Sequence, residues 1–166
     1  MRLRVIIVLA IIVAGAVAAV VGFNRIKLDA LDEPGPAETL LATNIKKILI
    51  ARSSRQGIRP APTDLKVSIK EGETVYGTDC SMCHGMDGRT PTDTGRWMYP
   101  RASDLTSPTV QQYSDRELFW IIKNGIRLTG MPAFGKVEPD EHIWNLVTYV
   151  RTLPGNTAAK KEGDSN

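Results

Sequence analysis

The stretch Cys80-Ser-Met-Cys83-His84 contains both cysteines and one of the two histidines of a 166-residue chain. Two thiols separated by two residues lie on one short turn, and a histidine follows directly. This C-x-x-C-H spacing is the attachment signature of a c-type haem, in which each thiol adds to one vinyl group. His84 would then lie under the iron as its proximal ligand. The chain is therefore predicted to bind one covalent haem c and its iron.

Two other uses of a cysteine pair fit this sequence less well. A zinc site needs four ligands, and the chain offers only Cys80, Cys83, His84 and His142, of which Cys83 and His84 are adjacent. A thioredoxin-like redox pair needs a βαβ pattern, whereas the sequence around the motif has helical periodicity. Haem attachment is the favoured interpretation.

A second axial ligand has to come from farther along the chain. Met131 follows His84 by 47 residues, in a loop where glycines and a proline can hold one conformation against the iron. Met98 and His142 are the alternatives: Met98 is expected to pack at the haem edge, and His142 falls within an amphipathic helix. Three methionines lie too near the motif or at the chain start to serve: Met1, Met82 and Met86.

Three main helices are predicted around this motif, and no strand pattern competes with them. Ser68-Ile-Lys-Glu71 and Ser114-Asp-Arg-Glu117 have the capping-box pattern that begins a helix. Gly125 suits the end of the second helix, Pro139 the first turn of a third, and Pro154-Gly155 its end. The apolar face of the third helix consists of Ile143, Leu146, Val147 and Val150.

Residues 1–27 are predicted to be a membrane anchor. Val5 to Phe23 is an uncharged run that as a helix spans about 28 Å, close to the hydrocarbon thickness of a bilayer. A cleaved signal peptide is the alternative, because Ala14-Gly-Ala16 and Ala16-Val-Ala18 resemble cleavage sites. Arg2 and Arg4 before the run favour a cytoplasmic amino terminus, whereas Arg25 and Lys27 after it oppose that bias. Small residues at every fourth position could pack on another membrane helix: Ala10, Ala14, Ala18 and Gly22.

Residues 28–66 are predicted to be a tether with a short amphipathic helix between two proline pairs. Its apolar stripe and basic residues suit either anionic lipid headgroups or packing on a partner subunit or on the folded domain itself. If wholly disordered, the tether would reach about 35 Å. The apolar positions are Leu40, Leu41, Ile45, Ile48 and Leu49, the basic ones Lys46, Lys47 and Arg52, and the prolines Pro34, Pro36, Pro60 and Pro62.

The distribution of charge argues against nucleic-acid binding. The net charge is +3, but residues 1–27 carry four basic and no acidic residues, whereas residues 67–154 carry nine basic and eleven acidic ones. A nucleic-acid footprint requires a basic patch on the folded domain. We therefore expect no nucleic-acid partner.

Residues 67–154 resemble a class I cytochrome c domain, which implies an all-α fold around the haem. Four segments carry the resemblance, in the family's order. They are Gly72-Glu-Thr-Val-Tyr76 with Cys80-x-x-Cys83-His84-Gly85, Tyr99-Pro-Arg101-Ala-Ser-Asp104-Leu-Thr106, the helix and distal loop from Glu117 to Pro132, and the closing helix from Ile143 to Pro154. The resemblance does not extend to the tether or to residues 155–166, a tail expected to be disordered.

The resemblance also implies particular contacts. The first and last helices should cross near Gly72 and Tyr149, and a backbone carbonyl, with Pro91 as the candidate, should bond to His84. Arg101 is the candidate partner of a haem propionate, because a buried carboxylate needs a charge-assisted donor; a plain surface arginine is the alternative.

With both axial positions filled, the iron has no site for oxygen, peroxide or a substrate. The expected function is therefore a single-electron carrier, not an enzyme, held on the periplasmic face of a bacterial inner membrane by one helix. Its partners would be a membrane redox complex or a periplasmic dehydrogenase or oxidase, besides the lipid bilayer. The alternatives are a fixed subunit of a larger respiratory or dehydrogenase complex and, in third place, a haem peroxidase or ligand sensor.

Overall fold

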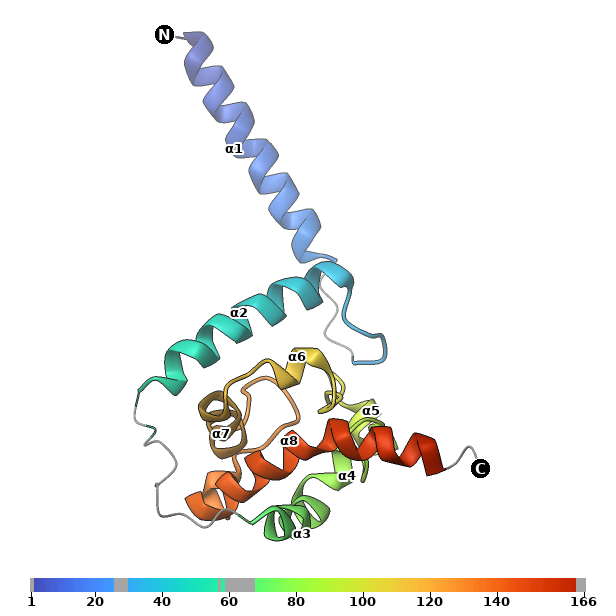
Figure 1. The fold of residues 1–166 in the computed structure, drawn as a ribbon. Coiled ribbons are helices and arrows are strands. Elements are labelled where there is room, and N and C mark those ends of the chain that lie inside the picture. Colours follow the sequence, from blue (N-terminus) through green and yellow to red (C-terminus); the bar gives the residue numbers. More distant parts are fainter. Residues whose placement is uncertain (1, 26–29, 57, 59–67, 164–166) are drawn as a thin grey trace. The chain divides into compact units, whose positions relative to one another are not determined.

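The structure, a computed structural model, describes residues 2–25, 30–56, 58 and 68–163, with the backbone alone for 154–163. Helices are the only regular elements within these ranges (Figure 1), so the predicted all-α fold is confirmed. Met1, Lys27, Pro60 and Pro62, which entered the anchor and tether predictions, lie outside the described residues. The elements are α1 (Arg2–Phe23), α2 (Pro36–Ser54), α3 (Ile69–Asp79), α4 (Ser81–His84), α5 (Asp93–Trp97), α6 (Pro108–Gln111), α7 (Asp115–Asn124), η1 (Phe134–Lys136) and α8 (Asp140–Gly163).

The chain forms two compact units, Met1–Asp32 and Glu33–Asn166. In the first unit, α1 has no buried residue and is long and apolar enough to cross a membrane. A signal sequence near the amino terminus meets the same criterion, so this helix fits both the predicted anchor and its alternative.

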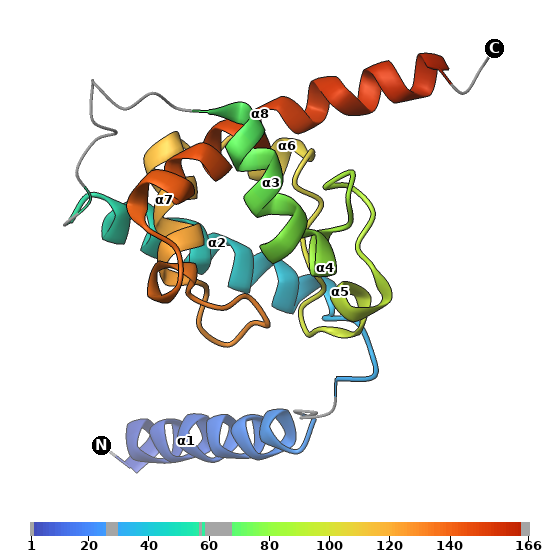
Figure 2. The same cartoon turned by 90° about the horizontal axis from the view of Figure 1, so that it is seen from below.

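The second unit is built on the crossing of α3 and α8, the two helices with the most extensive mutual contact (Figure 2). At the crossing, a Cβ on Gly72 would lie 2.2 Å from the Asn145 carbonyl oxygen and 2.9 Å from the Tyr149 Cβ. Only glycine permits so close an approach. The rings of Tyr76 and Tyr149 pack 5.1 Å apart beside it. The predicted crossing near Gly72 and Tyr149 is confirmed.

Asn145 is a fully buried polar residue of α8. Its side chain accepts the hydrogen bond that Glu71 was predicted to accept in the capping box at the start of α3. Its Oδ1 accepts from the Ser68 backbone N–H (2.9 Å), and its Nδ2 donates to Glu71 Oε2 (2.9 Å). Ser68 Oγ accepts from the Glu71 N–H, but the Glu71 carboxylate turns to Asn145, so the capping box predicted there is only half formed. The box at Ser114 is complete, with Glu117 Oε2 accepting from the Ser114 N–H at 2.7 Å.

α7 and α8 supply most of the apolar core. The Phe119 and Trp144 rings stack 4.3 Å apart between them, and α7 ends at Gly125, as predicted, with φ at 66°. The buried apolar residues of α7 are Leu118, Phe119, Ile121 and Ile122, and those of α8 include Ile143, Leu146, Val147 and Val150.

The end predicted for the last helix is wrong. α8 continues past Pro154 and Gly155 to Gly163 and so includes residues 155–163 of the predicted tail. The residues after the Pro154-Gly155 pair include alanine, lysine and glutamate, which favour a helix. Their propensity offsets the missing proline N–H that suggested a helix end.

α2 packs against α7 with one face (Figure 1). Ile50 is buried in the core at 3% exposure. Lys47 Nζ donates to Gln112 Oε1 at 3.1 Å, and Tyr99 Oη donates to Glu38 Oε1 at 2.7 Å. Of the interpretations left open for this helix, packing on the domain itself describes its inner face.

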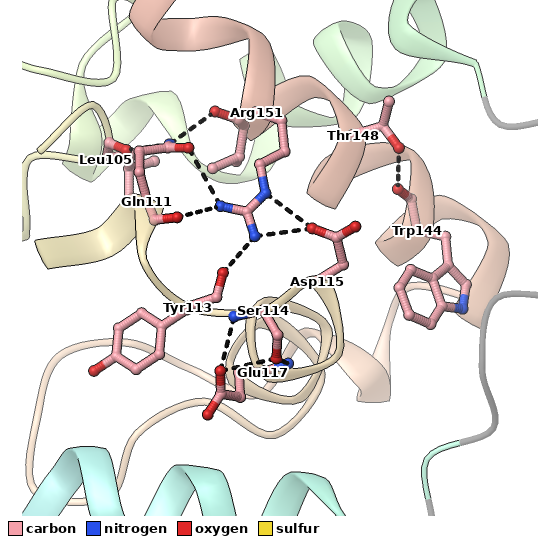
Figure 3. Close-up of polar contacts among 10 residues, drawn as sticks. Leu105, Gln111, Tyr113, Ser114, Asp115, Glu117, Trp144, Thr148 and Arg151 are labelled. Atoms are coloured by element: carbon pink, nitrogen blue, oxygen red, sulfur yellow. Dashed lines mark hydrogen bonds and ion pairs between the residues drawn. The ribbon is translucent and has the colours of Figure 1, made fainter. Parts of the chain in front are cut away.

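Arg151 of α8 bonds to the end of α6, to the start of α7 and to the segment between them (Figure 3). Its Nε donates to Asp115 Oδ1 at 2.9 Å and its Nη1 to the Gln111 carbonyl at 2.8 Å, while its Nη2 donates to the Tyr113 carbonyl. The side chain is 28% exposed. One planar guanidinium thus satisfies two backbone carbonyls that precede α7.

We expect Arg151→Ala to lower the free energy of unfolding by about 2 kcal/mol, because charge-assisted bonds to partly buried carbonyls are lost. Urea unfolding of the haem-loaded full chain in detergent, followed by circular dichroism, measures this change. Arg96→Ala is the control, because both side chains of the Arg96–Asp93 pair are more than half exposed, and loss of the pair should change stability by less than about 0.5 kcal/mol. Equal effects of the two substitutions would contradict the role given to Arg151.

Candidate functional site

The cysteine motif forms a single helical turn at the end of α3. Cys80 caps α3, and the Cys83 and His84 N–H groups both donate to the Cys80 carbonyl, at 3.1 and 3.0 Å. Both thiols are free and half-buried, and burial raises the pKa of the Cys80 thiol to about 12. Cys80 is therefore a neutral thiol at physiological pH. This is the arrangement that the attachment spacing predicted for two thiols on one turn.

These residues line a cavity of about 320 Å³, within the range of cofactor pockets. All five predicted site residues meet there: Cys80, Cys83, His84, Arg101 and Met131. Much of the remaining wall is apolar and comes from α7 and α8: Leu118, Ile121, Ile122, Leu146 and Val150. The largely apolar wall, the paired thiols and the two candidate axial ligands fit a covalently attached haem.

The His84 ring is held by a backbone carbonyl. Its Nδ1 lies 2.9 Å from the Ser103 oxygen. Burial lowers the pKa of His84, and the bond to Ser103 opposes that shift. A neutral imidazole that donates from Nδ1 keeps the Nε2 lone pair for a metal. The prediction that Pro91 supplies this carbonyl is wrong: the loop containing Arg101 passes the ring instead.

The loop that carries Met131 is braced by its own hydrogen bonds. The Met131 N–H donates to Thr129 Oγ1 (3.1 Å), and the Thr129 hydroxyl donates to the Ile126 carbonyl (2.7 Å). The Ile126 N–H in turn donates to the Met131 carbonyl at 3.3 Å. At Gly125, with φ at 66°, a Cβ would lie 2.7 Å from that carbonyl. The loop can close only over a glycine, so the position of Met131 is set by backbone geometry.

The other candidate ligands are placed differently. Met98 lines the cavity, and its sulfur would lie 2.5 Å from a Cβ on Gly130, so it packs beside the Met131 loop. His142 is absent from the cavity wall, and its Nδ1 pairs with Glu138 at 2.7 Å. Within the part of the chain that the structure describes, no three His, Cys, Asp or Glu side chains gather in a metal-binding group.

Arg101 lies on the cavity wall and pairs with Glu33. Both side chains are more than half exposed, so the pair is weak and the guanidinium can also turn to a propionate. Lys46 of α2 is a second cation on the wall. Lys46 could not be recognised as a site residue from the sequence, because nothing in the local pattern shows that α2 reaches the cavity.

Tyr76 ties α3 to the end of the cysteine motif. Its buried hydroxyl donates to the Gly85 carbonyl at 2.7 Å, and burial is the main cause that raises its pKa. Gly85 itself has φ at 75°, and a Cβ there would lie 2.2 Å from the Thr90 carbonyl oxygen. The residue directly after His84 is thus held from two sides.

We expect Tyr76→Phe to cost about 1–2 kcal/mol of stability, because the Gly85 carbonyl loses its buried donor. Urea unfolding of the haem-loaded chain gives the value. Tyr149→Phe removes a neighbouring hydroxyl with no hydrogen bond in the described part of the chain and should cost less. A larger loss in Tyr149→Phe would show that the Tyr76–Gly85 bond is unimportant.

The fold and this cavity together define a c-type cytochrome domain. Comparison with protein families matches residues 67–150 to cytochrome C oxidase, cbb3-type, subunit III, and the chain belongs to that family. Among curated proteins it is similar to the cbb3-type cytochrome c oxidase subunit FixP of Azorhizobium caulinodans, with 26% identity over 92% of this chain. The chain spans about half the length of that relative (52%).

Proposed function

We propose that this protein is a membrane-anchored cytochrome with one haem c that passes single electrons and does not itself catalyse a reaction. The observation that carries the proposal is that Cys80, Cys83, His84 and Met131 line the same cavity. A haem bound there supplies one-electron exchange between ferric and ferrous iron. Cys80 and Cys83 would hold it covalently, His84 and Met131 would ligate the iron, and Arg101 would neutralise a propionate.

With both His84 and Met131 as ligands, the iron of a bound haem would have no open position. The apolar wall from α7 and α8 would limit the access of water to a bound haem, and burial of this kind is one of the protein features that set a haem's reduction potential. We infer that α1 remains as the anchor and that the cytochrome domain lies on the outer face of a bacterial inner membrane. The sequence supports this orientation through the arginines that precede α1.

Carbon monoxide tests the closed coordination. The purified full chain should contain one haem and titrate as a one-electron couple, and its reduced spectrum should not change under carbon monoxide. A carbon monoxide complex in the unmodified protein would show an open or easily opened position. That outcome would replace the carrier with a ligand sensor or a peroxidase.

A second candidate is a fixed subunit of a respiratory complex. It is favoured by the similarity to FixP, which is named as an oxidase subunit. Gentle detergent extraction of the tagged full chain from its native membranes, followed by sizing and mass spectrometry, decides between the two. Stoichiometric co-migration with an oxidase or another redox complex supports the subunit, and migration alone supports a tethered carrier.

A further inference from the structure

α2 has an outer face that the cytochrome domain does not use. Its inner face carries the buried Ile50 and Ser54. The outer face carries large apolar side chains that are about half to two-thirds exposed: Leu40 67%, Leu41 63%, Ile45 48%, Ile48 67% and Leu49 54%. Apolar residues gathered on one helix face of a folded domain mark a surface that binds something apolar.

The outer face has a charge pattern as well. Leu41, Ile45, Ile48, Arg52 and Arg55 follow one another at steps of four, three, four and three residues, so they form one stripe along the helix. The stripe is apolar in its first part and cationic at its end. This order suits a helix lying in a bilayer interface, with aliphatic side chains among the acyl chains and guanidinium groups at the phosphates.

The chain itself brings α2 to a membrane surface. Only residues 24–35 separate the end of α1 from the start of α2. Fully extended, they span about 40 Å, so an anchored α1 keeps the start of α2 within that distance of the lipid. A basic amphipathic surface held so close to anionic headgroups is attracted to them.

We propose that the outer face of α2 binds the anionic lipid surface of the membrane in which α1 is anchored. The contact holds the cytochrome domain flat on the bilayer, with α2 between the lipid and the haem cavity that Lys46 lines. Such a domain serves partners within the same membrane surface. The proposal rests on α1 being retained as the anchor, and it adds the lipid contact.

Labelling of single engineered cysteines tests this contact. Cys80 and Cys83 are consumed by thioether bonds in the haem-loaded protein, so Ile48→Cys gives one reactive thiol on the outer face. Thr74→Cys is the control, because Thr74 is exposed on α3, which lies on the far side of the domain from α2 (Figures 1 and 2). The full chain is placed in nanodiscs of phosphatidylcholine with phosphatidylglycerol and treated with a charged maleimide.

We expect Ile48→Cys to react about tenfold more slowly in nanodiscs than in dodecyl sulfate. Burial of one aliphatic side chain in lipid supplies enough free energy to shift the population of the outer face about tenfold toward its lipid-bound state. Thr74→Cys should not show this slowing. Arg52→Gln with Arg55→Gln should restore the labelling rate of Ile48→Cys, and Arg96→Gln, an exposed arginine of α5, should not. Phosphatidylcholine alone should protect less than the anionic mixture.

The outcomes of this experiment distinguish failure of the lipid contact of α2 from failure of the proposed anchored cytochrome. Haem absorbance that co-elutes with the nanodiscs reports the anchored cytochrome, and labelling is measured on those particles. Equal slowing at both positions, or none, overturns the lipid contact and leaves the carrier in place. Protection in native membranes but not in nanodiscs shows a protein partner on this face instead, and a chain recovered without α1 overturns the anchor and the contact together.

Discussion

Gly72→Ala should destabilise the cytochrome domain by about 3 kcal/mol, the upper end of the range of about 1–3 kcal/mol that is typical of overpacking, because backbone lies in the way. The added Cβ would lie 2.2 Å from the Asn145 carbonyl oxygen and 2.7 Å from its carbon, and these main-chain atoms of α8 cannot rotate aside. α3 and α8 would have to separate. Folded domains have only about 5–15 kcal/mol of stability in total.

Gly77→Ala is the matched control, on the same helix. A Cβ at Gly77 meets nothing within 4 Å, so alanine should raise stability by about 0.5–1 kcal/mol through helix propensity. Urea unfolding of both haem-loaded variants in detergent, monitored by circular dichroism, gives the comparison. A mild effect of Gly72→Ala, with the same sign as Gly77→Ala, would show that the helices do not cross this closely.

Met131→Ala should abolish the far-red sulfur-to-iron charge-transfer band of the oxidised protein. It should also lower the reduction potential by on the order of 100 mV, since loss of a thioether ligand removes its preference for ferrous iron. The reduced variant should bind carbon monoxide at the vacated position. Absorption spectra and a potentiometric titration of the full chain measure these effects.

Met98→Ala and His142→Ala are the controls for this assignment. Met98 lines the same cavity but packs against Gly130, and His142 pairs with Glu138, so both variants should keep the band. If the band survives in Met131→Ala and is lost in Met98→Ala, then Met98 is the ligand.

Features encoded by short-range spacing could be predicted from the sequence. The C-x-x-C-H turn, the complete cap at Ser114 and the helix end at Gly125 each depend on residues within a few positions of one another. The loop that carries Met131 could also be predicted, because its glycines and proline lie together in the sequence. Their chemistry is local, and so the sequence shows it directly.

Features that depend on distant partners could not be predicted in the same way. Glu71 bonds to Asn145 of α8 instead of completing its own cap. The carbonyl beside His84 comes from Ser103, nineteen positions away, and no residue type marks such a carbonyl. Lys46 reaches the cavity because α2 packs on α7. The helical pattern of α2 does not determine which surface the helix packs against.

Because α3 packs against α8, the last helix of the chain, the haem cavity cannot form until late in synthesis. The cysteine turn follows α3, but two residues of the cavity wall, Leu146 and Val150, belong to α8 and leave the ribosome more than sixty residues later. Until that last helix packs against α3, the cavity lacks part of its wall and the cysteine turn remains open on that side. The cavity can therefore close only after the whole domain has been synthesised.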